Sequence, residues 1–249
     1  MLEIRDLNYS IKKSGRGFLI NNINFELEDG YIMGLVGRNG SGKTTLLNLI
    51  YKAITPDSGK VLWNGEEVNS NNRYVFHNDV AYIGNEDWCF KYKSVNENIE
   101  MLSLLYKDFD EKLFGQYIKY FELREADRNK KYLALSMGQK MQFQIAFAMA
   151  RRPKLMLMDE PMANLDPIIK VDLMELLQQN VAKENMSIII STHLVDDISN
   201  MTDYIGLLDN GIMKEFGNRE KLFDKYGTEG LREFLIESGK LIRLQSLLA

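Results

Sequence analysis

The chain has 249 residues, of which 45% are hydrophobic and 27% are charged, with a formal net charge of -4. This length accommodates one large α/β domain with room for a smaller lobe. The slight acidic balance does not support a nucleic-acid partner, which usually requires a basic surplus. The single cysteine, Cys89, excludes an intramolecular disulfide and favours a reducing, cytosolic compartment, with a buried position as its expected role.

Neither a leader sequence nor a membrane span is expected. The amino terminus, MLEIRDLNYS, lacks the basic start and the apolar stretch of a signal peptide. No uninterrupted apolar run approaches the ~18 to 20 residues that cross a bilayer. Any work at a membrane would therefore need another polypeptide.

Strands are predicted in the first part of the chain. Residues 2–9 and 20–28 alternate apolar and polar side chains, as half-buried antiparallel strands do. Residues 31–36 form an apolar strand that leads through a glycine-rich loop into a helix over 44–52. Residues 61–68, with an Asn-Gly turn in the middle, predict a hairpin that extends the antiparallel part.

Helices and two buried strands are predicted in the second part. Helical patterns from about residue 92 to 133, for example over 95–106 and 111–121, predict a helical lobe. Two nearly all-apolar runs, 155–158 and 188–190, are separated by a leucine-rich helical stretch, which is typical of buried parallel strands. The core is therefore expected to be α/β, and the last part of the chain is mostly amphipathic helix that packs onto it.

A phosphate-binding loop is predicted at GRNGSGKTT, which matches G-x-x-x-x-G-K-[ST] between a strand and a helix. Backbone N–H groups would converge on phosphate oxygens there, and the helix adds its positive N-terminal end. Lys43 should bridge the β- and γ-phosphates, Thr44 should ligate Mg²⁺, and Thr45 is expected mainly as a helix residue. The predicted nucleotide-binding residues of this loop are Gly37, Arg38, Asn39, Gly40, Ser41, Gly42, Lys43, Thr44 and Thr45. The alternative, a glycine-rich turn with a surface lysine, is disfavoured by the flanking strand and helix.

Two carboxylates follow the buried strand at 155–158. Asp159 and Glu160 would emerge at its carboxyl end, where α/β sheets bind ligands, and would point to opposite sides. Asp159 is predicted to hold Mg²⁺ and Glu160 to polarise the attacking water. An isolated Asp-Glu pair would more often be a solvated turn, but the loop at Lys43 favours the catalytic interpretation.

His193 follows the second buried strand and is predicted to point at a γ-phosphate. As a hydrogen-bond donor it would hold the phosphate and the water in line, which is a positioning role in catalysis. The other histidine, His77, is expected to be structural or exposed in a polar loop.

The segment LSMGQ, residues 135–139, stands between these motifs and precedes the helical run KMQFQIAFAMARR. It resembles the signature segment of ATP-binding cassette (ABC) ATPases, usually LSGGQ, with Met137 at the first glycine and Ser136, Gly138 and Gln139 in place. A serine and backbone amides that open a helix form an anion site. The resemblance implies that this site contacts the γ-phosphate held by a partner subunit. By itself the segment would also suit a simple helix cap.

The resemblance covers roughly residues 2–215 and implies further functional loops. Residues 163–166, Ala-Asn-Leu-Asp, correspond to the D-loop, where Asp166 would communicate between two sites. The Q-loop departs from the pattern, because AYIGNED places Asn85 or Glu86 near the usual glutamine. Asparagine is one methylene shorter and glutamate adds a charge beside Mg²⁺. Asn85 is taken as the metal-ligand candidate, and the coupling to a transmembrane partner is expected to be altered.

The aromatic side chain that stacks on adenine in this family also departs from the pattern. Ile11 occupies the expected slot, with Tyr9 and Phe18 nearby. Tyr9 is the favoured candidate, and its alternative is an aromatic packed in a half-buried strand.

The resemblance implies an α/β fold: a P-loop NTPase core with a mostly parallel sheet, an antiparallel β subdomain and an inserted α-helical subdomain. A single domain over 1–249 would divide into a nucleotide-binding core at 1–86 and 152–215, a helical signature subdomain at 87–151, and a C-terminal helical tail at 216–249.

The implied function is that of an ATP-hydrolysing motor subunit of an ABC membrane transporter, with ATP and Mg²⁺ as cofactors. It would work as a homo- or heterodimer, with ATP between the phosphate loop of one subunit and LSMGQ of the other. Integral membrane permease subunits would hold it at the cytoplasmic face of the cell membrane. The variant signature, the acidic Q-loop and the single cassette per chain resemble bacterial ABC-2 type exporters.

Other classes fit less well. Ribosome-acting relatives carry two cassettes in one chain, and DNA-repair relatives insert a long coiled coil between the motifs; the sequence has neither feature. The remaining alternative is a soluble ABC ATPase that serves as a scaffold or regulator without transport.

Overall fold

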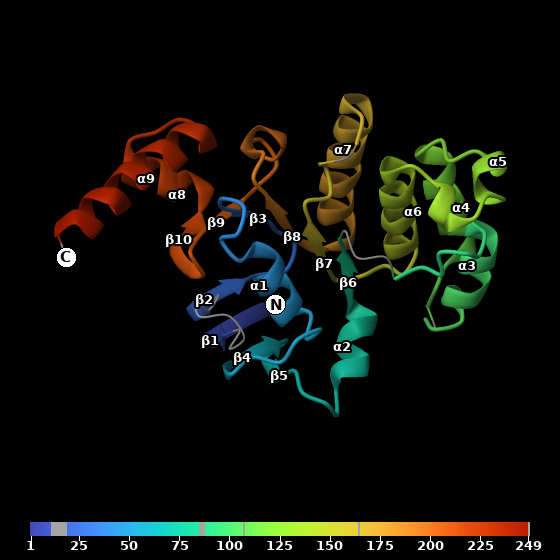
Figure 1. The fold of residues 1–249 in the computed structure, drawn as a ribbon, viewed down its shortest axis with the longest axis horizontal. Coiled ribbons are helices and arrows are strands. Elements are labelled where there is room, and N and C mark those ends of the chain that lie inside the picture. Colours follow the sequence, from blue (N-terminus) through green and yellow to red (C-terminus); the bar gives the residue numbers. More distant parts are fainter. Residues whose placement is uncertain (11–18, 85–87, 107, 164, 249) are drawn as a thin grey trace.

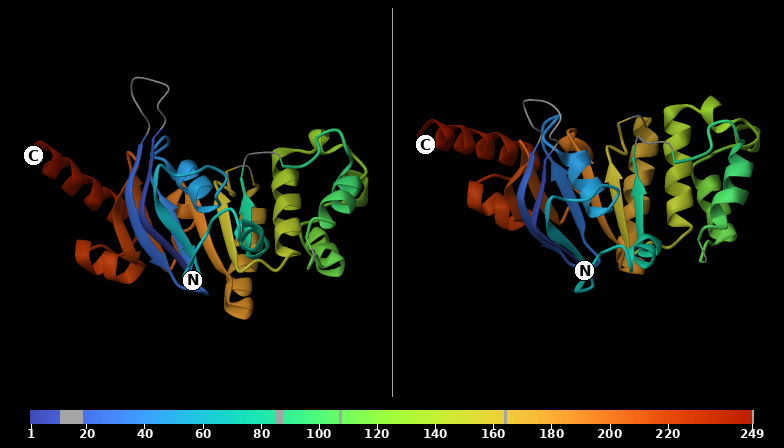
Figure 2. Two further views of the ribbon diagram at one scale, coloured as in Figure 1. Left: turned by 90° about the horizontal axis from the view of Figure 1, so that it is seen from below. Right: turned by 60° about the horizontal axis from the view of Figure 1, so that its bottom comes forward.

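The computed structural model describes residues 1–10, 19–84, 88–106, 108–163 and 165–248. Two sheets occupy the middle of an elongated molecule (Figure 1). A lobe of helices lies at one end, and the two C-terminal helices lie at the other end, as the views of Figure 2 also show. The α/β class predicted from the sequence is confirmed.

The first sheet is antiparallel, with strand order β2-β1-β4-β5. Its strands are β1 (Leu2–Ser10), β2 (Leu19–Leu27), β4 (Ser58–Trp63) and β5 (Glu66–Glu67). The predicted strand pair and the predicted hairpin are both confirmed. In the hairpin turn, Asn64 and Gly65 both have positive φ, 52° and 82°, as a two-residue turn of the I′ type requires.

The second sheet has the order β10-β9-β3-β8-β7-β6, and only β10 runs antiparallel to its neighbour. Its strands are β3 (Ile32–Val36), β6 (Val80–Ile83), β7 (Leu155–Asp159), β8 (Ser187–Thr192), β9 (Tyr204–Asp209) and β10 (Ile212–Asn218). The two predicted apolar strands are adjacent and parallel. Each is buried on both faces, as strands of a parallel sheet usually are.

Part of this sheet was not predicted. The strands β6, β9 and β10 are absent from the sequence analysis, although Asn210-Gly211 between two apolar runs is a hairpin signal. The predicted boundary of the helical tail at residue 216 is therefore wrong. Residues 216–218 complete β10, and the helical part is α8 (Arg219–Tyr226) and α9 (Leu231–Leu248).

Three helices accompany the strands of the core. They are α1 (Lys43–Ile50), α2 (Arg73–Asp79) and α7 (Pro167–Glu184). The helix predicted after the phosphate loop is confirmed as α1, two residues shorter at its end. The expectation that His77 lies in a polar loop is wrong, because it lies in α2 with its ring stacked on Tyr51.

The predicted helical lobe is confirmed. It contains α3 (Val95–Ser103), α4 (Glu111–Tyr120), α5 (Glu125–Arg128), the short 3₁₀ helix η1 (Tyr132–Ala134) and α6 (Met137–Met149). Its centre is aromatic, since Phe114, Phe143 and Phe147 are buried and pack against one another. Cys89 is buried beside it, as predicted.

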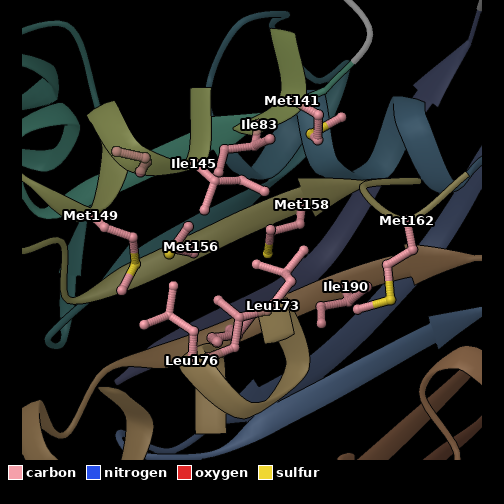
Figure 3. Packing of buried hydrophobic residues seen from close by; sticks show 14 of the residues in the cluster. Ile83, Met141, Ile145, Met149, Met156, Met158, Met162, Leu173, Leu176 and Ile190 are labelled. Atoms are coloured by element: carbon pink, nitrogen blue, oxygen red, sulfur yellow. The ribbon is translucent and has the colours of Figure 1, made fainter. Parts of the chain in front are cut away.

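The lobe joins the sheet through a layer rich in methionine. Figure 3 shows Met141, Ile145 and Met149 of α6 above Met156 and Met158 of β7. The leucines that alternate with these methionines along β7 belong to a second cluster on the other face of the sheet. No helix among the described residues combines the length and the apolar character that crossing a bilayer demands.

Candidate functional site

The predicted site residues follow the carboxyl ends of three neighbouring strands. Strands β3, β8 and β7 are parallel and in register, with Val36 opposite Thr192 and Asp159 opposite Ser191. The phosphate loop (Gly37–Thr45), the Asp-Glu pair and His193 therefore meet at one edge of the sheet, the usual ligand edge of α/β folds.

The phosphate loop depends on its glycines. Gly40 and Gly42 have φ of 82° and 111°, which favours glycine, and Gly42 directly precedes α1. A Cβ atom on Gly37 would collide with the Leu208 carbonyl and the Ser41 hydroxyl. The loop is fixed further by the Gly211 amide, which donates to the Ser41 carbonyl oxygen at 2.8 Å. The unpredicted β9–β10 turn thus supports the loop.

Lys43 is buried, with 6% of its side chain exposed, and its ammonium points into the loop. Nζ donates to the Gly37 carbonyl oxygen at 2.9 Å and lies 3.5 Å from Glu160 Oε1. A bound phosphate would compete with these acceptors for the same three N–H donors. The geometry is that of a cationic anchor inside an anion-binding loop.

Thr44 and Asp159 lie in contact and form a set of oxygen ligands. The Thr44 hydroxyl donates to Asp159 Oδ2 at 2.7 Å, and the Ser191 hydroxyl donates to Asp159 Oδ1 at 2.5 Å. Asp159 is buried, so its orientation is fixed. A hydroxyl and a carboxylate suit Mg²⁺, which prefers hard oxygen ligands. Ser191 was missed by sequence reasoning, and its only sequence signal is its place at the end of a buried strand.

Glu160 and His193 form a pair on the exposed side of the site. Glu160 Oε2 lies 2.9 Å from His193 Nδ1, and the two side chains are 17% and 39% exposed. The backbone of Glu160 is left-handed, with φ of 50°, a conformation that costs about 1–2 kcal/mol for a non-glycine residue. Its amide donates to the Ser191 carbonyl oxygen at 3.1 Å, which holds the turn.

The contact between Glu160 and His193 determines which ring nitrogen of His193 can donate a hydrogen bond. Because the Glu160 carboxylate is an acceptor, Nδ1 carries the proton of the neutral ring, and Nε2 is then an acceptor. Donation from Nε2 to a phosphate therefore requires the imidazolium, whereas donation from Nδ1 requires the ring to leave Glu160.

A cleft of about 630 Å³ opens beside the tip of the loop. Arg38, Asn39 and His193 line it from the site, and Leu235 and Gly239 of α9 form its opposite wall. The sequence analysis placed α9 on the core only as packing. Helix α9 therefore lines a cleft beside the phosphate loop, a contact that the sequence motifs did not predict.

The signature residues lie elsewhere on the chain. Ser136 is exposed and caps α6: its hydroxyl accepts from the Gln139 amide at 3.1 Å, and Gln139 Oε1 accepts from the Ser136 amide at 3.0 Å. Met137 is 49% exposed, so a side chain in place of the usual glycine finds room. Strands β8, β7 and β6 follow β3 in the sheet, and α6 packs on β6 and β7, so Ser136 and Gly138 do not join the phosphate loop of their own chain (Figure 1).

Two other predicted residues have local structural partners. Asp166 caps α7, where its Oδ1 accepts from the Ile168 amide at 3.0 Å. Tyr9 is partly buried and packs against the core cluster of the antiparallel sheet. The remaining candidates, Asn85 and Glu86 for the Q-loop and Ile11 and Phe18 for the adenine, lie outside the described residues.

Comparison with known proteins is consistent with these motifs. A family model described as ABC transporter matches residues 20–163, more than half of the chain. The chain is similar to the ABC transporter ATP-binding protein YtrB of Bacillus subtilis, at 30% identity over 91% of this chain and 75% of that protein. It is also similar to the methionine import ATP-binding protein MetN 2 of Pseudomonas syringae, at 31% identity over 90% of this chain and 69% of that protein. The lantibiotic transport ATP-binding protein SrtF of Streptococcus pyogenes is 27% identical over 94% of this chain and 99% of that protein.

Solved structures share the fold. An ATP-binding subunit of an ABC transporter superposes with a TM-score of 0.85 over 96% of this chain and 99% of that chain, at 24% identity. A dimeric bacterial cassette, MJ0796, superposes with a TM-score of 0.79 over 88% of this chain and 98% of that chain, at 23% identity. At these identities the likeness establishes the fold alone.

Proposed function

Because the chain belongs to the family of ABC transporter ATP-binding proteins and is an ABC ATPase, we propose that it drives a membrane transporter as a dimer with two composite ATP sites. Each ATP would lie between the phosphate loop of one subunit and the LSMGQ segment of the other. The observation that carries this proposal is the convergence of Lys43, Asp159, Glu160 and His193 at one sheet edge, with Ser136 exposed elsewhere on the chain.

The buried side of the site would bind the triphosphate. Lys43 would turn its ammonium from the Gly37 carbonyl oxygen to the β- and γ-phosphates. Thr44 and Asp159 would hold Mg²⁺ with their oxygens, and Ser191 would keep the carboxylate in place. Mg²⁺, when bound, supplies positive charge that stabilises the phosphate oxygens.

The exposed side of the site would perform hydrolysis. Glu160 would accept a proton from the water that attacks the γ-phosphorus, while the bond to the β-phosphate oxygen breaks and ADP leaves. His193 would hold the phosphate and the water in line, and its contact with Glu160 keeps both groups together.

The positions of the signature residues support a dimer. Ser136 and Gly138 open α6 with exposed or half-exposed groups that the helix N-terminus makes suitable for an anion. Their helix packs on β6 and β7 (Figure 3), whereas the phosphate loop of the same chain follows β3, and β8 lies between β3 and β7. A second cassette would bring its own Ser136 to this chain's nucleotide, and Asp166 would lie near the contact.

We propose that permease subunits bind an apolar surface at the start of the lobe and so hold the protein at the cytoplasmic face of the membrane. Residues 88–92 lie against α3, since the Phe90 amide donates to Asn98 Oδ1 at 2.7 Å. Apolar side chains are exposed on residues 88–92, which directly follow the Q-loop candidates, and at or just beyond the end of α3: Trp88, Phe90, Tyr92, Met101, Leu104 and Leu105. A surface of this kind usually marks a protein partner.

Export is the direction that we propose, because the variant signature and single cassette resemble ABC-2 type exporters. Relatives named for import and for lantibiotic transport both match the chain. A scaffold or regulator without transport is the second candidate, and recovery of the protein without any membrane protein would favour it.

The solution mass of the Glu160→Gln protein tests the composite site. Loss of the base should leave ATP bound but uncleaved, so we expect a shift from monomer to dimer when Mg²⁺-ATP is added, measured by light scattering. Turnover should fall by about 100-fold or more. A monomer that binds ATP at saturation would contradict a self-pairing motor, and unchanged turnover would remove Glu160 as the base.

A further inference from the structure

A buried arginine joins the helical lobe to the sheet. Arg151 follows α6 and is 8% exposed. Its Nη2 donates to the His77 carbonyl oxygen at 2.5 Å and to the Val80 carbonyl oxygen at 3.4 Å. On the side of the lobe, its guanidinium carbon lies 3.6 Å from the ring centroid of Tyr106, a cation–π contact. One side chain therefore ties the end of α6 to the start of β6 and to the segment after α3.

This joint continues to the helix of the phosphate loop. The ring of His77 stacks on Tyr51 with centroids 4.4 Å apart, and its Nε2 lies 2.8 Å from the Tyr51 carbonyl oxygen. Tyr51 is the residue directly after α1, the helix that begins with Lys43. A continuous line of contacts thus runs from the nucleotide-binding helix to the end of α6.

Much of the remaining contact between α6 and β7 is made by methionine side chains. Met141 and Met149 of α6 face Met156 and Met158 of β7, as Figure 3 shows. Methionine side chains are flexible and specify relative orientation poorly. The hydrogen bonds of Arg151 to the His77 and Val80 carbonyl oxygens are directional, so they favour one orientation of the end of α6 on the sheet.

A small tilt would matter at the other end of the helix. The 13 residues of α6 span about 20 Å at a rise of 1.5 Å per residue. A tilt of about 10° about Arg151 would therefore move Ser136 by roughly 3 Å. Catalytic contacts lose much of their effect over displacements of about 1 Å.

We propose that Arg151 is a positioning residue for ATP hydrolysis: it fixes the tilt of α6 and thereby sets where Ser136 meets the nucleotide on the partner subunit. The inference rests on the proposed composite site. Within the part of the chain that the structure describes, Arg151 makes no hydrogen bond, ion pair or ring contact with a predicted nucleotide-binding residue, so its effect would reach the reaction through α6 and through the line of contacts to α1. Among the described residues its buried Nε has no partner, which indicates a side chain that is not optimised for stability alone.

Substitution of Arg151 by Met and by Lys tests the proposal. Met preserves most of the apolar packing but makes no hydrogen bonds, and Lys keeps the charge without the planar fork. The matched control is Arg152→Met, because Arg152 is the next residue, has a side chain that is 56% exposed, and forms surface ion pairs with Asp110 and Glu184.

For Arg151→Met we expect kcat to fall about tenfold to 100-fold, with the ATP dissociation constant of the monomer within about twofold of the parent. In the Glu160→Gln background, dimer formation should need about tenfold more Mg²⁺-ATP. Arg151→Lys should recover part of both losses, and Arg152→Met should match the parent in all three measurements.

Two outcomes would overturn the inference. In the first, Glu160→Gln forms dimers, and adding Arg151→Met changes neither the kcat of the parent protein nor the Mg²⁺-ATP concentration that dimer formation needs. In the second, the loss of kcat follows the unfolded fraction measured by thermal denaturation. Should Arg151→Met fail to fold, Tyr106→Leu removes the ring that contacts the Arg151 guanidinium and should lower kcat in the same way. If Glu160→Gln does not dimerise at all, the self-pairing composite site fails, and the inference about Ser136 of a second copy fails with it.

Discussion

Two adjacent carboxylates have different surroundings because the chain turns sharply between them. Asp159 ends β7 and accepts hydrogen bonds from Thr44 and Ser191. Glu160 adopts a left-handed backbone, so its carboxylate faces Lys43 and His193 instead. This separation would allow one carboxylate to hold Mg²⁺ and the other to receive a proton.

Ser191→Ala should weaken Mg²⁺ use more than ATP binding. The substitution removes the donor to Asp159 Oδ1 and frees the carboxylate to rotate, so we expect the Mg²⁺ concentration for half-maximal ATPase activity to rise about tenfold. The measurement is an Mg²⁺ titration at saturating ATP.

Ser187→Ala is the matched control for this substitution. Ser187 is also buried and lies at the opposite end of β8, where its hydroxyl donates to the Glu28 carbonyl oxygen at 3.1 Å. We expect an unchanged Mg²⁺ requirement for it. Equal Mg²⁺ curves for the two variants would contradict a role for Ser191 in holding Asp159.

Among the secondary-structure elements, α6 begins with a helix cap at the position where the proposed anion site would lie. Ser136 and Gln139 form a capping box, which satisfies amides at the start of the helix. The same cap leaves the helix N-terminus exposed for an anion. The cap uses the amides of Ser136 and Gln139, so the amides of Met137 and Gly138 between them would serve an anion, and a helix cap and an anion site are compatible descriptions of this segment.

Helix α2 carries a histidine whose protonation should destabilise the fold. Burial and, to a smaller extent, the charges of Arg73 and Arg151 lower the pKa of His77, although its hydrogen bond to Tyr51 opposes this. The unfolded chain then binds the proton more readily, so stability is lost as the pH falls below about 6.5 toward the folded-state pKa. The melting temperature should therefore decrease between pH 6.5 and 5.

His77→Gln should flatten this part of the pH profile, as differential scanning fluorimetry would show. Gln removes the titrating group and retains an N–H donor for the Tyr51 carbonyl oxygen. His193→Gln, which removes the chain's other histidine from an exposed position, should keep the decrease. A decrease of the same steepness in His77→Gln and in the parent would contradict the assignment.

At the scale of the whole molecule, the sheet separates the phosphate loop from the LSMGQ segment, the two halves of the composite site that we propose. The phosphate loop follows the central strand β3, and the signature helix packs on β6 and β7. The layout supports a function that needs two copies. It also leaves the apolar surface at residues 88–92 and the end of α3 available to a third partner.

Leu104→Asp should weaken membrane association without changing soluble ATPase activity. Leu104 is 84% exposed at the end of α3, so a charge there costs the fold little but disrupts an apolar interface. We expect the fraction that sediments with membranes from the source cells to fall several-fold. The control is Ile168→Asp, 73% exposed on α7, which should sediment like the parent.

The amino-acid sequence was sufficient to predict the glycine-rich loop before α1, the Asp-Glu pair and the two buried strands. These features are local: a glycine pattern, adjacent carboxylates and short apolar runs are each read from a few consecutive residues. The same locality explains the confirmed hairpin at Asn64-Gly65 and the helical lobe.

The contacts that join distant parts of the chain became visible in the three-dimensional structure alone. Ser191 contacts Asp159 across 32 positions, and Arg151 contacts His77 across 74. The wall that α9 adds to the cleft likewise depends on packing, as does the support of the loop by the β9–β10 turn. Sequence patterns report which face of an element is apolar, whereas the choice of neighbours depends on how whole elements pack.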